Sequence, residues 1–329
     1  MRKIILEEHW DHPINREIAE EYFKRTKLRA FTYGGFHDDR KLKQVTAGIE
    51  EYRLKDMDAA GIDIQILSNG YPGIQGVRGA EEAVTKSKMI NDALTEITHK
   101  HPTRFKGFAT LPLQDPGAAA DELERAVKEL GFVGALINGH TNGEFLDEDK
   151  FRCVWERSIE LGVPLYLHAF DPIPDQSHNL YKGYETLLGP PWSWNIDTAT
   201  HAMRIIASGL FEELPDAKLI LGHMGEFIPY MLARIDEGYM QTGGAKTWKI
   251  PREPSYYYRK NVYITTSGLW NPETLVCAVS ALTAEHVLFS VDYPLADLDY
   301  GIEQVERTPI SQEDKEKIYH KNAEKMFNI

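Results

Sequence analysis

Eight short runs of apolar and β-branched residues alternate with longer helical segments along nearly the whole chain. The predicted strands are residues 3–6, 62–67, 105–110, 133–138, 164–168, 218–223, 262–266 and 287–292. The predicted helices are residues 51–60, 80–100, 116–130, 148–161, 196–213, 226–240, 272–281, 298–307 and 312–327. Such regular alternation favours a parallel sheet of the α/β class, and eight units favour its closure into a (β/α)8 TIM barrel.

An open, doubly wound sheet is the competing fold. It is disfavoured because no Gly-x-Gly-x-x-Gly turn follows the first strand. No shift in composition marks a linker, so the sequence predicts a single domain over residues 1–329. Residues 11–45 and 170–195 are longer than ordinary connections, and we expect them to be inserted loops at the C-terminal face of the barrel.

Charge and composition argue against several kinds of partner. The net charge of −13 would repel nucleic acid and anionic membranes. No apolar run reaches the roughly 20 residues that a membrane helix needs. Cys153 and Cys277 are widely separated among apolar neighbours, which is typical of reduced core thiols. We therefore expect a cytoplasmic enzyme with no nucleic-acid or membrane partner.

Two carboxylates and an imidazole follow the first strand. Alternation along an extended chain would send Glu7 and His9 to one face and Glu8 to the other, so that Glu7 and His9 converge. Such a pair suits a metal ion, although a charged strand end that reaches solvent would have the same sequence.

Three later strands end in the same way, with His168, His223 and Asp292. The C-terminal strand ends of a barrel face one mouth, so these side chains would meet Glu7 and His9 there. Imidazoles mixed with carboxylates suit Zn²⁺ or Mn²⁺. Any one of these histidines could instead be a polar residue hydrogen-bonded near a strand end, but their common placement favours a metal centre.

Several motifs make the chain recognisable. They are Leu6-Glu7-Glu8-His9, Phe108–Pro116, Gly131–Gly139, Leu167-His168, Ile220–Glu226, Ile264–Gly268 and Leu288–Pro294. Together they resemble the amidohydrolase superfamily and, within it, the non-oxidative aromatic acid decarboxylases that act on γ-resorcylate (2,6-dihydroxybenzoate) and 2,3-dihydroxybenzoate. The resemblance implies a carbon–carbon lyase that forms homodimers or homotetramers.

The resemblance also implies roles for particular residues. One divalent metal ion, Zn²⁺ or Mn²⁺ with Mg²⁺ as a further option, would be held by Glu7, His9, His168 and Asp292, and no organic cofactor would be required. His223 and Glu226 would act beside Asp292, with Glu226 orienting His223. Arg234 would help to hold the substrate; its alternative is a surface ion pair with Asp236 or Glu237.

The expected substrate is a small aromatic carboxylate. A hydroxybenzoate of the salicylate or dihydroxybenzoate class would chelate the metal through its carboxylate and phenolate oxygens, Asp292 would protonate the ring carbon, and CO₂ would leave. Trp194 and Leu295 would line the pocket, and Asn138 would hydrogen-bond a ring hydroxyl.

The chain departs from the family pattern near the pocket. Ala169-Phe170-Asp171-Pro172 stands where Pro-Arg-Asn-Pro is common, Leu295 replaces a usual aromatic residue, and Trp194 stands where Phe is usual. These changes remove a cation from the mouth and put the identity of the substrate in question more than the class of reaction.

Two other functions compete with the lyase. A hydrolase on the same scaffold would open a lactone or amide with a metal-bound water; it is disfavoured because most hydrolytic members begin with His-x-His, where this chain has Glu7-Glu8-His9. A barrel with a purely structural metal would need a closed ligand set, usually with Cys.

Overall fold

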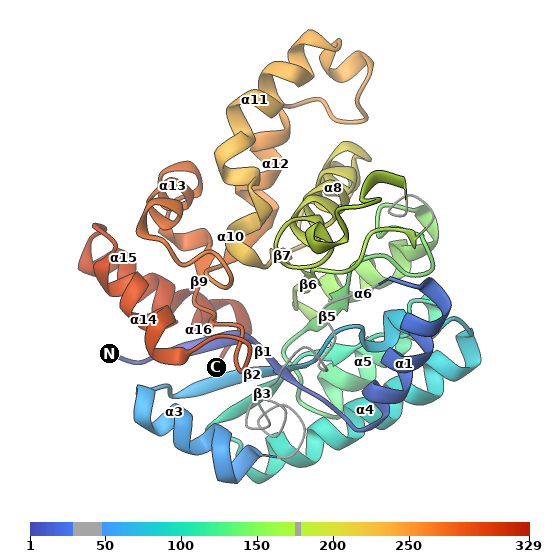
Figure 1. The fold of residues 1–329 in the computed structure, drawn as a ribbon. Helices are drawn as coiled ribbons and strands as arrows, with labels where there is room; N and C mark the ends of the chain where they lie inside the picture. The colour runs from blue at the N-terminus through green and yellow to red at the C-terminus, as the bar shows by residue number, and fades with distance from the viewer. Residues whose placement is uncertain (29–47, 175–178) are drawn as a thin grey trace.

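Parallel strands in chain order form the centre of the computed structural model, which describes residues 1–28, 48–174 and 179–329 (Figure 1). The strands are β1 (Ile4–Trp10), β2 (Ile64–Asn69), β3 (Phe105–Gly107), β4 (Ala109–Thr110), β5 (Ala135–Asn138), β6 (Leu165–His168), β7 (Leu219–Leu221), β8 (Val262–Thr265) and β9 (Val287–Leu288). They pair side by side as β1-β2-β3 and as β4 through β9. The predicted strand 105–110 is therefore interrupted at Phe108. The α/β barrel class that was predicted from the alternation of strands and helices is confirmed.

Backbone hydrogen bonds link the two sheets. Phe108 N donates to Leu67 O at 2.9 Å, across the interruption between β3 and β4. At the other end, Leu6 N donates to Phe289 O at 3.3 Å and His9 N donates to Tyr293 O at 2.8 Å. The first strand therefore lies against the segment that follows the last strand, which brings the two ends of the strand order together.

Alternation along the strands separates two apolar layers. Ile5 packs into the layer between strands and helices, whereas Ile4 and Leu6 belong to an inner cluster. Tyr166 lies in that inner cluster, and Phe327 of the last helix also packs there. The strands are therefore buried on both faces, as parallel strands covered by helices should be.

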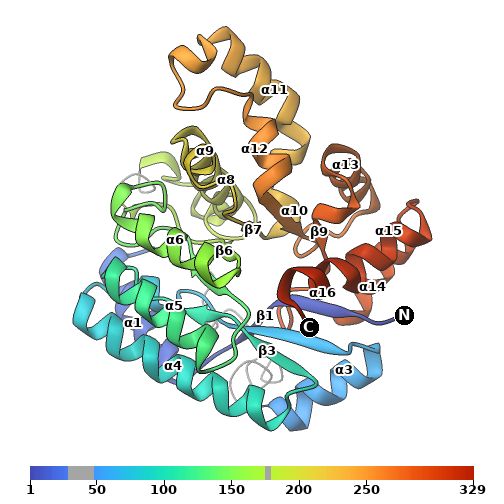
Figure 2. The ribbon, with the colours of Figure 1, turned by 180° about the vertical axis from the view of Figure 1, so that it is seen from behind.

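Helices surround the strands (Figures 1 and 2). The α-helices are α1 (Ile14–Thr26), α3 (Leu54–Ala60), α4 (Ala80–Lys100), α5 (Pro116–Lys128), α6 (Arg152–Leu161), α8 (Ser193–Ala207), α9 (Leu210–Glu213), α10 (His223–Glu226), α11 (Ile228–Gln241), α12 (Pro254–Asn261), α13 (Pro272–Leu282), α14 (Leu298–Arg307), α15 (Gln312–Glu316) and α16 (Asn322–Phe327). Shorter helical turns are η2 (Ile49–Arg53), η3 (Gly73–Gly76), η4 (Asp149–Phe151), η5 (Glu185–Leu187), η6 (Gly244–Lys246), η7 (Ala284–His286) and η8 (Lys317–Lys321).

Several boundaries differ from the predictions. Helix α8 begins at Ser193, so Trp194 lies in its first turn and not on a loop. The predicted helix 226–240 is divided at Phe227, whose φ is 66°. The last strand ends at Leu288, which leaves Asp292 in the following loop. Helix α12 lies between residues 240 and 262, where no helix was predicted.

The two long connections differ in what the structure describes. In residues 11–45, helix α1 covers Ile14–Thr26, and residues 29–45 lie outside the described part of the chain. In residues 170–195, η5 and the start of α8 are the regular elements in the part described. No helix in the described ranges is long and apolar enough to cross a membrane.

Candidate metal centre and ring pocket

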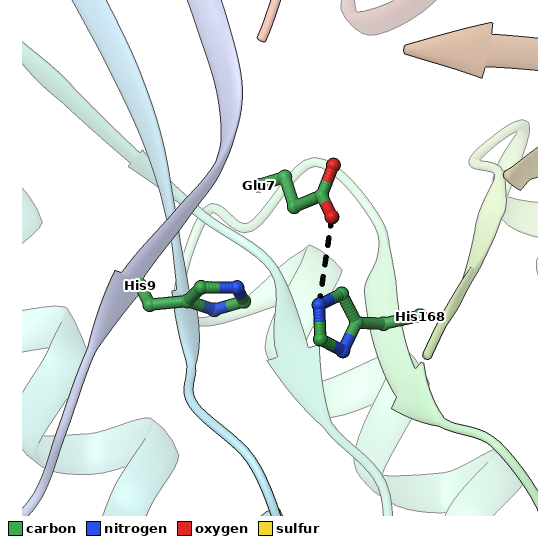
Figure 3. Close-up of side chains that lie close together, drawn as sticks. All are labelled: Glu7, His9 and His168. Atoms are coloured by element: carbon green, nitrogen blue, oxygen red, sulfur yellow. Dashed lines mark ion pairs between the residues drawn. The ribbon is translucent and has the colours of Figure 1, made fainter. Parts of the chain in front are cut away.

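Glu7, His9 and His168 point toward one another at the C-terminal ends of β1 and β6 (Figure 3). One ligand atom from each lies within 4.8 Å of the others, and all three residues are buried. His168 Nε2 lies 3.5 Å from Glu7 Oε1. In the described ranges, this is the group of His, Cys, Asp and Glu side chains that could hold a metal ion.

The backbone of β1 reaches this arrangement through a bulge. Leu6 pairs with Ile66 and Glu8 pairs with Leu67, so Glu7 is an extra residue. Its φ of 71° is in the left-handed region. The predicted convergence of Glu7 and His9 is confirmed, but simple alternation is not its cause. Glu8 points elsewhere, as predicted, and accepts hydrogen bonds from Val291 N at 3.1 Å and Tyr293 N at 2.8 Å.

Asp292 lies at the same centre, with Oδ1 3.1 Å from His9 Nε2. Burial raises the pKa of its carboxyl group. Its φ of 68° is also left-handed, and the two N–H groups that donate to Glu8 flank it. Glu8 therefore holds both sides of the turn that carries Asp292.

Hydrogen bonds from the far side fix the two histidine ligands. His168 Nδ1 lies 2.8 Å from Asn138 Oδ1, and His9 Nδ1 lies 3.4 Å from Ser68 Oγ. This leaves Nε2 of each ring for a metal ion, the usual arrangement of metal-binding histidines. The predicted contact of Asn138 with a ring hydroxyl stays a prediction; in this structure its side-chain oxygen lies against His168, and Asn138 is not among the residues that line the cavity.

Three hydroxyl groups converge on one oxygen of Glu7. Tyr166 and Ser267 donate to Oε2, and Thr265 donates to it at 3.0 Å. Within the part of the chain that the structure describes, Oε1 has no hydrogen-bond partner, nor do His9 Nε2 and Asp292 Oδ1. Buried polar atoms normally have partners, so three such atoms around one point fit a metal ion.

These three hydroxyl donors were not among the predicted site residues. Tyr166 and Thr265 lie within predicted buried strands, and Ser267 follows one of them. A polar side chain on a strand buried on both faces must have a partner inside the barrel, which is the signal that could have found them.

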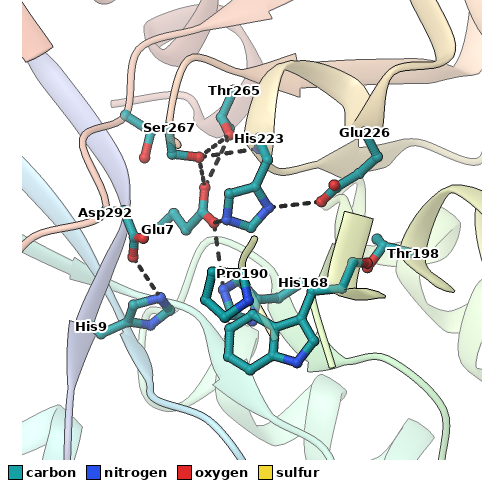
Figure 4. A network of polar contacts seen from close by, with 12 residues as sticks. Glu7, His9, His168, Pro190, Thr198, His223, Glu226, Thr265, Ser267 and Asp292 are labelled. Atoms are coloured by element: carbon teal, nitrogen blue, oxygen red, sulfur yellow. Dashed lines mark hydrogen bonds and ion pairs between the residues drawn. The ribbon is translucent and has the colours of Figure 1, made fainter. Parts of the chain in front are cut away.

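His223 and Glu226 form a second part of the site (Figure 4). His223 Nδ1 lies 2.7 Å from Glu226 Oε1, and Nε2 lies 3.2 Å from Glu7 Oε1. Burial opposes the charge of His223, but Glu7 and Glu226 outweigh it and raise its pKa to about 10. Burial raises the pKa of Glu226 to about 7. The predicted pairing of Glu226 with His223 is therefore present.

An unusual backbone positions this pair. Every residue from His223 through Phe227 has a positive φ, with 47° at His223 and 55° at Glu226. Residues held in this region cluster at functional sites, because the strain, of about 1–3 kcal/mol each, persists only where the surroundings enforce it. One left-handed turn thus directs both side chains to the centre.

A cavity of about 240 Å³ opens beside the centre. A cavity of about 150 Å³ accepts benzene, so one substituted aromatic ring fits here. Its lining residues are His9, Tyr71, His168, Pro190, Trp194, Asn195, His223, Gly268, Leu269, Trp270, Asp292 and Leu295. The predictions that Trp194 and Leu295 line the pocket agree with this structure.

Arg234 does not reach the cavity of its own chain. It lies on α11 with 66% of its side chain exposed, and it donates to Glu237 at 2.8 Å. This is the surface ion pair that we gave as its alternative. A contact between Arg234 and the substrate would require a neighbouring copy of the chain.

The chain is similar to known proteins over nearly its whole length. The amidohydrolase family model matches residues 12–329. A gamma-resorcylate decarboxylase of Polaromonas sp. (strain JS666 / ATCC BAA-500) is 38% identical over 325 residues, which cover 96% of this chain and 99% of the relative. Another, from Rhodococcus jostii (strain RHA1), is 38% identical over 336 residues, which cover 99% and 98%.

Solved structures give the same result. A 2,6-dihydroxybenzoate decarboxylase complexed with 2,6-dihydroxybenzoate superposes with a TM-score of 0.91 and 37% identity and covers all of both chains. A dihydroxybenzoic acid decarboxylase from Polaromonas sp. JS666, with bound manganese and the inhibitor 2-nitroresorcinol, has a TM-score of 0.89 and 38% identity and covers 99% and 96%.

Proposed function

The chain belongs to the amidohydrolase family, and within it we propose that this protein is a metal-dependent, non-oxidative decarboxylase of a hydroxybenzoate-type acid. The resemblance that we inferred from the sequence motifs is thereby confirmed. The observation that carries the proposal is the set of buried ligand atoms of Glu7, His9 and Asp292 that have no hydrogen bond within the described residues, beside a cavity that fits one aromatic ring.

The residues present suit a divalent ion. Glu7, His9, His168 and Asp292 would hold it, and we propose Mn²⁺ or Zn²⁺, with manganese supported by its presence in a similar structure. When bound, the ion would act as a Lewis acid for the carboxylate and phenolate oxygens of the substrate. The hydroxyl groups on Glu7 Oε2 keep that residue oriented with Oε1 toward the ion's position.

Asp292 is proposed to deliver the proton. Protonating the ring carbon that bears the carboxylate breaks aromaticity, after which CO₂ can leave and the phenol ring accepts the electrons. The side chain of Asp292 lines the cavity, and burial raises its pKa, which favours the protonated acid. His223 lies on the same cavity wall, where its charge can influence the proton on Asp292.

The apolar part of the cavity would hold the ring. Trp194, Leu295 and Tyr71 contribute apolar surface to its lining. Exclusion of water by these walls strengthens the electrostatic contacts of the carboxylate and keeps competing water away from the ring. The chain's own residues thus supply orientation, a dry pocket and a proton.

We also propose a cytoplasmic homodimer or homotetramer. Cys153 and Cys277 are free, as in a reducing compartment. Helix α11 exposes Tyr230 by 81% and Met240 by 64%, and such large apolar side chains favour burial against another copy. Light scattering on a sized sample will measure the mass, and a monomer at micromolar concentration would contradict the assembly.

The function is tested by CO₂ release. The panel is salicylate, 2,3-, 2,4- and 2,6-dihydroxybenzoate and 5-carboxyvanillate, each with native enzyme, with chelated enzyme, and after restoration with Mn²⁺ or Zn²⁺. We expect release that chelation abolishes and metal restores. Silence across the panel with metal shown to be bound would contradict the proposal and favour a hydrolase of a lactone or amide.

A further inference from the structure

Asp171 is buried behind the aromatic wall of the cavity. It follows β6, only 1% of its surface is exposed, and it does not line the cavity. Its carboxylate accepts hydrogen bonds from Trp194 Nε1 at 2.8 Å, from Tyr22 OH at 3.2 Å and from Tyr71 OH. The three donors come from α8, α1 and the loop after β2, so one carboxylate joins three elements that are far apart in sequence.

Two of these donors form the wall itself. Tyr71 and Trp194 line the cavity, and their ring centroids lie 4.8 Å apart at an interplanar angle of 47°. Tyr22 and Phe170 pack behind Tyr71, each with ring centroids within 6.3 Å of it. Because the Tyr71 hydroxyl and the Trp194 N–H both bond Asp171, these polar groups are turned away from the cavity, which receives the apolar parts of the rings.

The contacts recorded for the Asp171 side chain in the described part of the chain are all with neutral donors. Burial raises the pKa of this carboxyl group, and the hydrogen bonds from Trp194, Tyr71 and Tyr22 oppose that shift. A carboxylate accepts at both oxygens and donates nothing, so it suits three convergent donors. An amide of the same size suits them less well, because only one of its two polar atoms accepts.

We propose that Asp171 is a positioning residue that fixes Tyr71 and Trp194 as the ring-facing wall and thereby sets the affinity of the site for aromatic acids. This inference rests on the proposed decarboxylase function of the same cavity. It assigns Asp171 no contact with the substrate, so its effect should appear in binding and not in the proton-transfer step or in metal retention.

The test compares Asp171→Asn with Asp197→Asn. The amide introduced by Asp171→Asn has one accepting oxygen in place of two, so at least one wall side chain loses the acceptor for its O–H or N–H group. A tyrosine hydroxyl can then only accept from the amide N–H group, which weakens the hold on the wall. Asp197 lies in the same helix as Trp194 and interacts electrostatically with Asp171. Its substitution removes a nearby titratable carboxyl group without removing a bond to the wall.

We expect Asp171→Asn to raise KM for the preferred hydroxybenzoate about tenfold, with kcat within about threefold of the wild type. The Kd of 2-nitroresorcinol, measured by calorimetry on the metal-loaded enzyme, should rise by the same factor of about ten. Metal content and the pH profile of kcat should be unchanged, and Asp197→Asn should resemble the wild type.

If Asp171→Asn does not fold, the inference is tested with two variants that each remove one hydroxyl group, Tyr71→Phe and Tyr22→Phe. Tyr71→Phe keeps a ring in the wall but removes its bond to Asp171, and Tyr22→Phe removes a bond from a residue that does not line the cavity. We expect Tyr71→Phe to raise KM and Kd about threefold, and Tyr22→Phe to raise them less.

Wild-type KM and Kd in both Asp171→Asn and Tyr71→Phe would overturn this inference and leave the decarboxylase intact. A loss of kcat or of metal with unchanged KM would also overturn it, since Asp171 would then act on the centre. A wild-type enzyme that neither releases CO₂ from the panel nor binds 2-nitroresorcinol would overturn the proposed function, and this inference would fall with it.

Discussion

His223 Nε2 lies 3.2 Å from Glu7 Oε1, the carboxylate oxygen that has no hydrogen-bond partner among residues 1–28, 48–174 and 179–329. Glu226 holds the other nitrogen of the same ring at 2.7 Å. One imidazole therefore connects the metal-ligand set to a second buried carboxylate. This relationship joins the two halves of the site, and it places the His223 imidazole on the cavity wall that Asp292 shares.

Replacing Asp292 by Asn should nearly abolish turnover. The amide keeps the shape of the side chain but cannot supply the proton, so we expect kcat to fall about 10³-fold or more. Decarboxylation rates and metal content are measured together, because Asp292 is also a proposed ligand. A variant that kept about a tenth of the activity with full metal would rule out Asp292 as the proton donor.

Glu8→Gln should reduce kcat about tenfold with little change in KM, because one acceptor for the N–H groups beside Asp292 is lost and its left-handed turn relaxes. Steady-state kinetics against the exposed control Glu20→Gln measure this effect. Equal kinetics in the two variants would mean that Glu8 does not position Asp292.

Metal retention should depend on His168 and, more weakly, on Asn138. We expect His168→Ala to lose the ion on dialysis, and Asn138→Leu to weaken binding about 10–100-fold, because it frees the ring nitrogen that the amide oxygen holds. Elemental analysis after dialysis against graded chelator gives the affinities, with exposed His99→Ala as the control. Unchanged metal in His168→Ala would remove this residue from the ligand set.

Gly268→Ala should displace His223. An added Cβ would lie 2.6 Å from His223 Cδ2, so the ring must move, and we expect kcat to fall at least about tenfold. Gly131→Ala is the matched control: its φ of 73° is close to the 72° of Gly268, but nothing lies within 4 Å of its Cβ. A similar loss of activity in both variants would trace the effect to backbone strain and not to the contact.

The sequence predicts the parts of this site that depend on strand order. Eight alternating units place Glu7, His168 and Asp292 at one mouth wherever the exact boundaries fall, because parallel strand ends meet there. It does not predict the bulge at Glu7 or the left-handed turn at His223, since non-glycine residues enter that region only where tertiary packing enforces it. Local patterns carry no trace of such enforcement.

The hydrogen-bond partners of individual polar side chains could not be predicted from the sequence either. Asn138 was assigned to the substrate, but it contacts a neighbouring strand end at His168. Asp171 appeared only as part of the segment Ala169–Pro172 that departs from the family pattern, whereas the structure makes it the acceptor for three side chains from separate elements. Several polar groups lie at one mouth, and the distances between them decide which ones pair. The positions of the strands in the sequence do not give these distances.

Two buried histidines away from the metal centre should make stability depend on pH. His140 Nδ1 accepts from Gly143 N at 3.1 Å, and His201 Nε2 accepts from Leu146 N at 2.8 Å. An accepting nitrogen must be unprotonated. Burial lowers the pKa of His140 to about 4 and that of His201 to about 3.

The sign follows from proton uptake. Between about pH 4 and 6.5 the unfolded histidines bind protons that the native ones do not, so the free energy of unfolding should fall as the pH is lowered through this window. Each histidine contributes a slope of up to about 1.4 kcal/mol per pH unit. Urea unfolding of the metal-loaded wild type and of His201→Gln at several pH values isolates one contribution, because the amide can still accept from Leu146 but does not titrate. The free energy of unfolding should change less with pH in His201→Gln than in the wild type. If the two proteins show the same pH dependence, His201 takes up protons as readily in the native state as in the unfolded state, and the prediction is wrong.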